Sequence, residues 1–285
     1  MCLAIFSAPF HNFSHWLRQA RKRSRLSQLE LAALSDVSQR HISFLKSGRS
    51  KPGRDVATRL ASVLDLTMIE RNRLLDSAGF AALYSHSEPD APCMQPVLRA
   101  VRRMLEHHEP HPGVAMDRAY NVLQTNLAFD RLLHEVAPVD DLWQRTCGDG
   151  ARNLLKLSLH PGGLRSYRED FLGVAAGVME RAEREARHHP ELAEVFHVVR
   201  QYDGVSKAAN RAQSRTLPAQ GPVFFETYLV RGHRLRLFSV LSTMGAPTDV
   251  GAQALMVESF FPAGAWIVCR WAFDVIALPP VRGVR

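Results

Sequence analysis

The sequence lacks the features of membrane and secreted proteins. No apolar run reaches the roughly 18 residues that a membrane-spanning helix needs, so we expect no membrane partner. The apolar start of the chain has no basic segment in front of it, unlike a signal peptide. The four cysteines (Cys2, Cys93, Cys147 and Cys269) are far apart without CxxC spacing, which indicates neither a zinc site nor a disulfide framework. A protein of the reducing cytoplasm is therefore expected.

Catalytic motifs are also missing. The chain has no GxSxG, no GxGxxG after a strand, no HExxH and no phosphate-binding-loop lysine. A serine–lysine catalytic pair needs a lysine with a lowered pKa, and beyond residue 80 the only lysines are Lys156 and Lys207. Lys207 lies in a polar segment that is typical of a surface. We therefore expect no catalytic residues and no cofactor.

A histidine-rich stretch, EHHEPH at residues 106–111, has the composition of a metal cluster. Neighbouring residues on a helix point about 100° apart, so His107 and His108 cannot share one face. A helix end followed by a solvated loop is the better interpretation, and no metal site is expected.

Positive charge is concentrated at the start of the chain. Residues 1–80 hold 13 Lys and Arg against 6 Asp and Glu, a net +7, whereas residues 81–285 hold 23 against 22, a net +1. This distribution is typical of a nucleic-acid-binding module attached to a nearly neutral domain. A basic but inert surface is the alternative interpretation.

The sequence pattern predicts two domains and a linker. Residues 1–83 read as closely spaced helices, and residues 84–96 form a proline-rich linker, YSHSEPDAPCMQP. Residues 97–285 predict an α+β domain with a helical layer on an antiparallel sheet. There, two short strands flank Asp117-Arg118, Asn126 caps the next helix, residues 150–212 are mostly helical, and strands are expected at 223–230, 235–243, 254–261 and 265–273.

Two helical patterns within residues 27–47 are separated by almost no loop. Ser27 is placed to cap the first helix, and Glu30 completes a capping box. Leu31 and Leu34 are expected to form its apolar edge. Asp36 occupies the break between the helices, where a left-handed backbone is needed and Asp tolerates it better than most residues.

The second helix of the pair presents a polar face. Ser38 is placed to cap it, and Ile42 and Leu45 form its buried stripe. The other side chains point away from that stripe: Gln39, Arg40, Ser43 and Phe44. Two close helices of this kind indicate a helix-turn-helix, whose second helix fits the major groove of DNA.

The motifs LSQLELA, VSQRHIS and SGRSKP, followed by LTMIERNRLLDSAGF, resemble the five-helix, lambda-repressor-like domain of the XRE family over residues 13–80. Farther along, EPHPGVAMDRAYNVLQTNLAFDRLL, NLLKLSLHPGGLR, LRLFSVLSTMGAPTDV and VESFFPA resemble the C-terminal domain of MmyB-like transcription regulators. The second resemblance implies a PAS-like fold that holds a small ligand.

The first resemblance implies roles for individual residues. Gln28 is expected to contact a phosphate group of DNA. The residues at the start of the second helix are expected to contact base edges, and the residues that follow that helix are expected to contact phosphates. The candidate DNA-contacting residues are Gln28, Ser38, Gln39, Arg40, Ser43, Phe44, Arg49 and Lys51. The family usually has Glu at the position of Lys46, paired with an Arg that matches Arg21. Two like charges here predict either splayed helices or a Lys46 that turns toward phosphate.

The second resemblance implies an apolar pocket bounded by strands and helices. Alternate strand residues face one side of a sheet, so only one parity of each strand reaches the pocket. The candidate ligand-binding residues are Val114, Met116, Val122, Phe225, Leu237, Leu241, Met244 and Phe260, with Arg118 and His160 as possible polar anchors. The expected ligand is apolar or amphiphilic, such as a fatty acid.

Two functions from different classes remain open on the sequence. One is a homodimeric regulator that binds double-stranded DNA and senses a small ligand. The other is a DNA-binding repressor whose C-terminal domain only dimerises, without any ligand.

Overall fold

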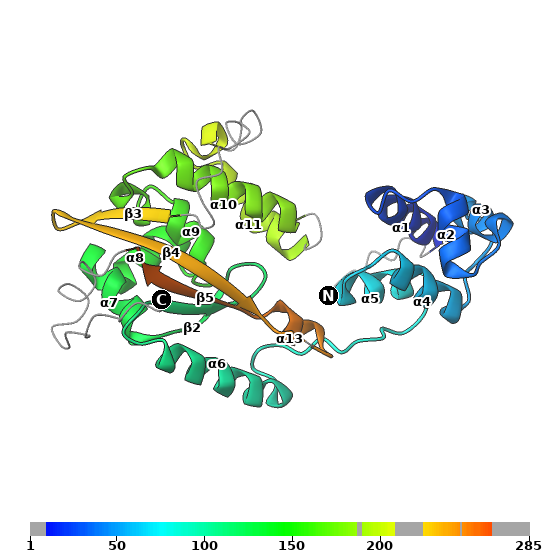
Figure 1. The fold of residues 1–285 in the computed structure, drawn as a ribbon, viewed down its shortest axis with the longest axis horizontal. Helices are drawn as coiled ribbons and strands as arrows, with labels where there is room; N and C mark the ends of the chain where they lie inside the picture. The colour runs from blue at the N-terminus through cyan, green and yellow to red at the C-terminus, as the bar shows by residue number, and fades with distance from the viewer. Residues whose placement is uncertain (1–9, 187–189, 209–224, 246, 264–285) are drawn as a thin grey trace, which may run out of the picture. The chain divides into compact units, whose positions relative to one another are not determined.

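The fold is taken from a computed structural model, which describes residues 10–186, 190–208, 225–245 and 247–263 (Figure 1). The chain divides into two compact units. The first comprises Met1–Glu88 with Pro247–Ala252, and the second comprises Pro89–Ala246 with Gln253–Arg285. The expected strand at 265–273 lies outside the described residues.

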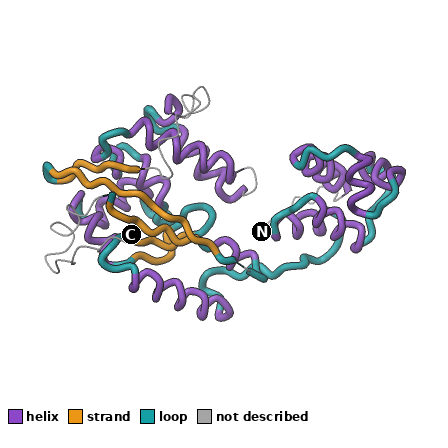
Figure 2. Tube along the Cα trace, in the orientation of Figure 1, coloured by secondary structure: helices purple, strands orange, loops and turns teal. Residues whose placement is uncertain are grey.

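The N-terminal part of the first unit is mostly helical (Figure 2). Its helices are α1 (Phe10–Arg23), α2 (Gln28–Ser35), α3 (Gln39–Ser47), α4 (Arg54–Val63) and α5 (Met68–Ser77). Their apolar faces meet in one core, which includes Leu17, Leu31, Ile42, Leu45 and Leu60. The expected five-helix domain is confirmed.

The predicted break between α2 and α3 is present. Ser27 and Glu30 form a reciprocal capping box, and Asp36 ends α2 with φ 52° and ψ 43°, in the left-handed region. Leu31 is fully buried as expected, but Leu34 is 62% exposed, so the expected apolar edge at Leu34 is wrong. Ser35 is buried in α2 instead. It can be buried because its hydroxyl donates a hydrogen bond to the carbonyl of Leu31 at 2.6 Å.

Arg21, which was expected opposite Lys46, makes a hydrogen bond to the backbone. Its Nη1 donates to the carbonyl oxygen of Leu26 at 2.5 Å. A different ion pair links α1 to α5, where Arg23 Nη2 lies 2.8 Å from Glu70 Oε1. The Glu70 side chain is almost fully buried, which makes this pair more than a surface contact.

We predict that Asp36→Gly stabilises the α2–α3 pair by about 0.5–1 kcal/mol, because glycine adopts the left-handed region without steric cost. Asp36→Ala is the matched control and should give no gain. Hydrogen-exchange protection of the α2 and α3 amides measures the effect. Equal or lower protection in the glycine variant would contradict the prediction.

The Asp249 carboxylate helps to anchor the end of the first unit. Asp249 accepts hydrogen bonds from the Ser87 hydroxyl at 2.9 Å and from the Ser87 backbone N–H at 3.3 Å. It also caps its own segment through the N–H of Gly251 at 2.8 Å. Burial raises the pKa of Asp249, but hydrogen bonds from Ser85, from the N–H of Ala252 and from Ser87 together outweigh it and lower the pKa to about 2. Part of the expected linker is therefore anchored rather than free.

The second unit places helices on both faces of a five-stranded antiparallel sheet of order β2-β1-β5-β4-β3. The strands are β1 (Gly113–Met116), β2 (Val122–Thr125), β3 (Phe225–Val230), β4 (His233–Thr243) and β5 (Met256–Pro262). The helices are η1 (Pro92–Met94), α6 (Gln95–His107), α7 (Leu127–Val136), α8 (Val139–Cys147), α9 (Leu154–Leu159), η2 (Leu164–Tyr167), α10 (Phe171–Ala186), α11 (Pro190–Arg200) and α13 (Val250–Ala254), which straddles the two units. The expected α+β domain is confirmed.

Strand β1 is buried on both faces. Ala115 and its cross-strand partner Val257 pack against α6 through Val101 and Leu105. Val114 and Met116, of opposite parity, join the large core under the helical layer formed by α7 to α11. Figure 1 shows α10 and α11 on one side of the sheet and α6 on the other.

Asn126 fixes the junction of α6, β1 and α7, and its predicted capping role is confirmed. Its side-chain oxygen accepts from the N–H groups of Phe129 and Gly113 at 3.0 and 2.9 Å. Its amide donates to the carbonyls of Leu105 and His111 at 3.1 and 2.8 Å. All hydrogen-bonding capacity of this buried amide is used, which sets where the sheet begins relative to its helical cover.

Across the described ranges, no helix is both long and apolar enough to cross a membrane. The same residues contain no group of three or more His, Cys, Asp or Glu side chains placed to hold a metal ion. In the histidine-rich stretch, the rings of His108 and His111 instead pack around Phe261, with the His108 ring edge-on at 4.9 Å.

Candidate DNA-binding surface and ligand pocket

Helix α3 has one buried and one exposed face. Ile42 and Leu45 are fully buried, and Ser38 caps the helix by accepting from the N–H of His41 at 3.2 Å. The guanidinium of Arg40 lies 5.4 Å from the centre of the Phe44 ring, so the aromatic side chain supports the arginine on the outer face. Of the candidate DNA-contacting residues, Gln28 and Phe44 are half-buried and the others are exposed: Ser38, Gln39, Arg40, Ser43, Arg49 and Lys51.

The end of α3 sets the position of the basic residues that follow it. Gly48 has φ +73°, and its N–H bonds back to the carbonyls of Leu45 and Phe44. The N–H of Arg49 also donates to the Phe44 carbonyl at 2.9 Å. The left-handed residue Gly48 therefore ends α3, and the exposed Arg49 follows directly after the helix.

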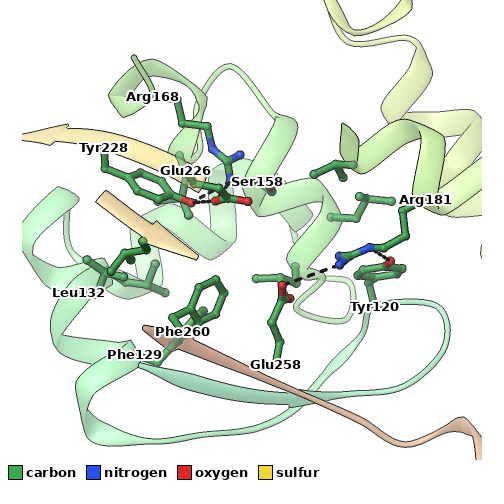
Figure 3. A pocket seen from close by; sticks show the side chains of 16 residues that line it. Tyr120, Phe129, Leu132, Ser158, Arg168, Arg181, Glu226, Tyr228, Glu258 and Phe260 are labelled. Atoms are coloured by element: carbon green, nitrogen blue, oxygen red, sulfur yellow. Dashed lines mark hydrogen bonds and ion pairs between the residues drawn. The ribbon is translucent and has the colours of Figure 1, made fainter. Parts of the chain in front are cut away.

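A cavity of about 50 Å³ lies between the sheet and the helical layer of the second unit. Figure 3 shows its polar lining, in which Arg168 and Arg181 approach from different sides. Apolar residues line the rest: Phe129, Leu132 and Leu133 from α7, Leu154 and Leu155 from α9, Val178 from α10, Leu237 from β4 and Phe260 from β5.

Arg168 is the most deeply buried charge of the cavity. It follows η2, pairs with Tyr228 as an isolated antiparallel bridge, and its side chain is 2% exposed. Its Nη2 donates to Ser158 Oγ at 2.7 Å and Tyr228 Oη at 2.9 Å, and lies 3.2 Å from Glu226 Oε2. Burial opposes the positive charge most strongly, but Glu226 and Tyr228 outweigh it and raise the pKa of Arg168. The guanidinium is therefore charged.

A second polar group lies at another side of the cavity. Tyr120 has φ 66° in the turn after β1, an uncommon conformation for an aromatic residue, and its hydroxyl accepts from Arg181 Nε at 3.2 Å. Burial raises the pKa of Tyr120 to about 12. Arg181 Nη1 lies 4.0 Å from Glu258 Oε1, which also accepts from the Ser239 hydroxyl at 2.6 Å.

Two of the expected ligand-binding residues, Leu237 and Phe260, line this cavity. The other six lie elsewhere. Val114 and Met116 are buried in the core, and Val122 and Leu241 pack against it without reaching the cavity. Phe225 pairs with Phe238 and contacts its ring edge-on at 5.9 Å, on the sheet face opposite Leu237. Met244 follows the end of β4 and is 42% exposed.

The polar lining was missed by the sequence interpretation. Of the expected anchors, Arg118 instead donates to the carbonyl of Gln253 at 3.1 Å, and the His160 ring packs edge-on against Tyr202 at 4.9 Å. The side chains in the cavity include Arg168, Arg181, Glu226 and Glu258. Two signals existed, since Glu226 and Tyr228, like Glu258 and Phe260, are spaced by two along their strands, which places each pair on one face.

Sequence models of two families match the chain. A helix-turn-helix model matches residues 17–70, and the model described as the MmyB-like transcription regulator ligand binding domain matches residues 97–265. The chain belongs to the MmyB-like transcription regulators. No curated protein matches it. The exposed face of α3 thus lies in the helix-turn-helix domain, and the cavity lies in the ligand-binding domain.

The charge state of Glu258 gives this MmyB-like regulator a testable pH dependence. Burial is the main cause that raises the pKa of Glu258, against the attraction of Arg181. The folded chain therefore holds this proton more tightly than the unfolded chain does. Wild-type stability should fall as pH rises from the ordinary value of 4.5 through the folded pKa.

We predict that Glu258→Gln is more stable than the wild type at neutral pH and that the two converge below the ordinary value of 4.5. The glutamine keeps the shape of the side chain and removes the charge. Urea unfolding at a series of pH values measures the difference. A stability difference that is constant with pH would contradict the assignment.

Proposed function

We propose that this protein is a homodimeric transcription regulator of the cytoplasm, without enzymatic activity, that binds double-stranded DNA through α3 and responds to a small amphiphilic ligand in the second unit. The observation that carries the proposal is the pairing of a helix-turn-helix with a largely apolar cavity that also holds two arginine–glutamate groups and their tyrosine partners. A helical layer inserted between β2 and β3 of an antiparallel sheet also supports the PAS-like expectation.

DNA binding rests on the chemistry of the exposed face of α3. Arg40 and Gln39 are long, exposed and polar at the start of the helix, where base edges in the major groove are within reach. Arg49 follows the Gly48 turn and suits a phosphate contact. The net charge of +7 over residues 1–80 supplies the general attraction to the duplex.

We predict that Arg40→Ala relaxes base preference at one operator position by about 1–3 kcal/mol, whereas Arg49→Ala weakens binding to all sequences alike and reduces the salt slope by about one. An operator selected from a random duplex library, titrated at several salt concentrations, separates the two effects. Uniform weakening by both variants would mean that Arg40 does not read bases.

The ligand is proposed to be fatty-acid-like. Leu132, Phe129 and Phe260 offer apolar contact, and burial of an acyl chain gains about 0.8 kcal/mol per CH₂. The cavity of about 50 Å³ has room for only about four water-sized groups. It therefore suits a carboxyl group with its first methylenes, and a longer chain must part the apolar side chains of the helical cover.

The experiment compares operator affinity of the lipid-stripped protein with and without fatty acid. We expect a change of about 5- to 150-fold, the usual range of coupling between two sites. Native mass spectrometry of the freshly purified protein reports occupancy and dimerisation. Proven occupancy with unchanged operator affinity would favour the second hypothesis, a DNA-binding repressor whose second unit only dimerises.

A further inference from the structure

Helix α6 carries a row of positive charge on the side that faces away from the sheet. Its buried side chains Val101 and Leu105 pack against the sheet through β1 and β5. Arg99 and Arg103 lie four residues apart on the far side of the helix, and both are exposed. Arg102 is also exposed and lies at the edge of this row, one turn from Arg99. The three arginines therefore form one continuous surface, here called the α6 arginine face.

The arginines of this face are unpaired within the part of the chain that the structure describes. Most other described arginines of the second unit contact a carboxylate, a carbonyl oxygen or an aromatic ring. Glu106 is one turn beyond Arg102, yet the two side chains form no ion pair. Like charges one turn apart repel and destabilise a helix. A face that keeps such charges unpaired is suited to a polyanion from outside the chain.

Duplex DNA is the polyanion that fits this face best. The planar guanidinium of arginine matches phosphate oxygens, and a duplex carries about one negative charge per 1.7 Å of its axis. DNA that is bound at α3, as proposed above, stays at a high effective concentration near α6 because one chain joins the two units. Contacts too weak to hold DNA by themselves then add to the affinity for the operator.

We propose that the α6 arginine face is a second DNA contact, which binds phosphates that flank the sequence read by α3. The proposal rests on DNA binding through α3 and assigns no role to the cavity. The contact is independent of base sequence, because phosphates are the same at every position. The second unit thereby contributes directly to operator affinity.

The test compares two duplexes that share one operator selected from a random library. One duplex ends at the operator, and the other carries about 15 further base pairs of arbitrary sequence on each side, more than one helical turn. The full-length wild type should bind the long duplex more tightly, and its affinity should fall more steeply with salt. The slope of log affinity against log salt should differ between the duplexes by up to about three per protomer.

The triple variant Arg99→Gln, Arg102→Gln, Arg103→Gln should lose both differences and keep the base preference of the wild type. The triple change of the same residues to Lys should retain most of the slope, because the ammonium group also binds phosphate as a point charge. Fluorescence anisotropy at several salt concentrations measures affinity and slope for each variant and duplex.

Arg131→Gln is the matched control for the single variant Arg103→Gln. Arg131 is exposed on α7, and it too has no partner among the described residues. Both variants remove one surface charge, so a general effect of net charge would be the same in each. Only Arg103→Gln should reduce the extra slope on the long duplex, by about one per protomer. Equal reductions in the two variants would overturn the proposal.

The remaining outcomes separate this proposal from the proposed function. Equal affinity of the wild type for the two duplexes, or a flank effect that the triple Gln variant retains, would overturn the α6 contact and leave operator binding through α3 intact. Failure of the wild type to select any operator would reject both. Arginine-dependent binding to phosphatidylglycerol vesicles, without any effect of the flanks, would overturn the DNA contact in favour of a lipid surface.

Discussion

The ion pair of Arg168 and Glu226, enclosed by apolar side chains, is the constraint on which the second unit depends. Removing two charges from water costs more than their attraction usually returns, so stability alone is a weak reason for such a pair. Its neighbours nevertheless support it: Tyr228 on β3 and Ser158 on α9 both accept from Nη2 of the arginine, and Tyr228 also donates to Glu226 at 2.6 Å. The pair is therefore better explained by the fixed geometry that it gives the cavity than by a gain in stability.

The two units use charge in opposite ways. On α3, Arg40 and its neighbours are exposed, so their interactions with a partner are long-ranged, screened by salt and matched to a polyanion. In the cavity, Arg168 is excluded from water, so its interactions are short-ranged and little affected by salt. DNA binding should therefore weaken steeply with salt concentration, while ligand binding should hardly change.

The sequence predicts local structure well because caps and apolar periodicity are short-range signals. The Ser27–Glu30 capping box, the Asp36 turn and the Asn126 cap all follow from residues within a few positions. The cavity lining does not, because Tyr120, Arg168, Arg181 and Glu258 come from separate elements that only the fold brings together. Hydrophobicity marked Phe225 and Met244 as lining residues, yet sheet parity and the end of β4 place them elsewhere.

A signal requires that the ligand prefer one arrangement of the protein over another, since equal affinity for two states shifts nothing. Coupling between sites is typically about 1–3 kcal/mol. Each hydrogen bond to a charged group contributes about 1.5–3 kcal/mol, so a polar contact that forms in only one state is enough to supply that coupling. In the proposed fatty-acid-like ligand, a tail that parts the helical cover also favours one arrangement over the other. Both the headgroup and the tail can therefore carry the signal.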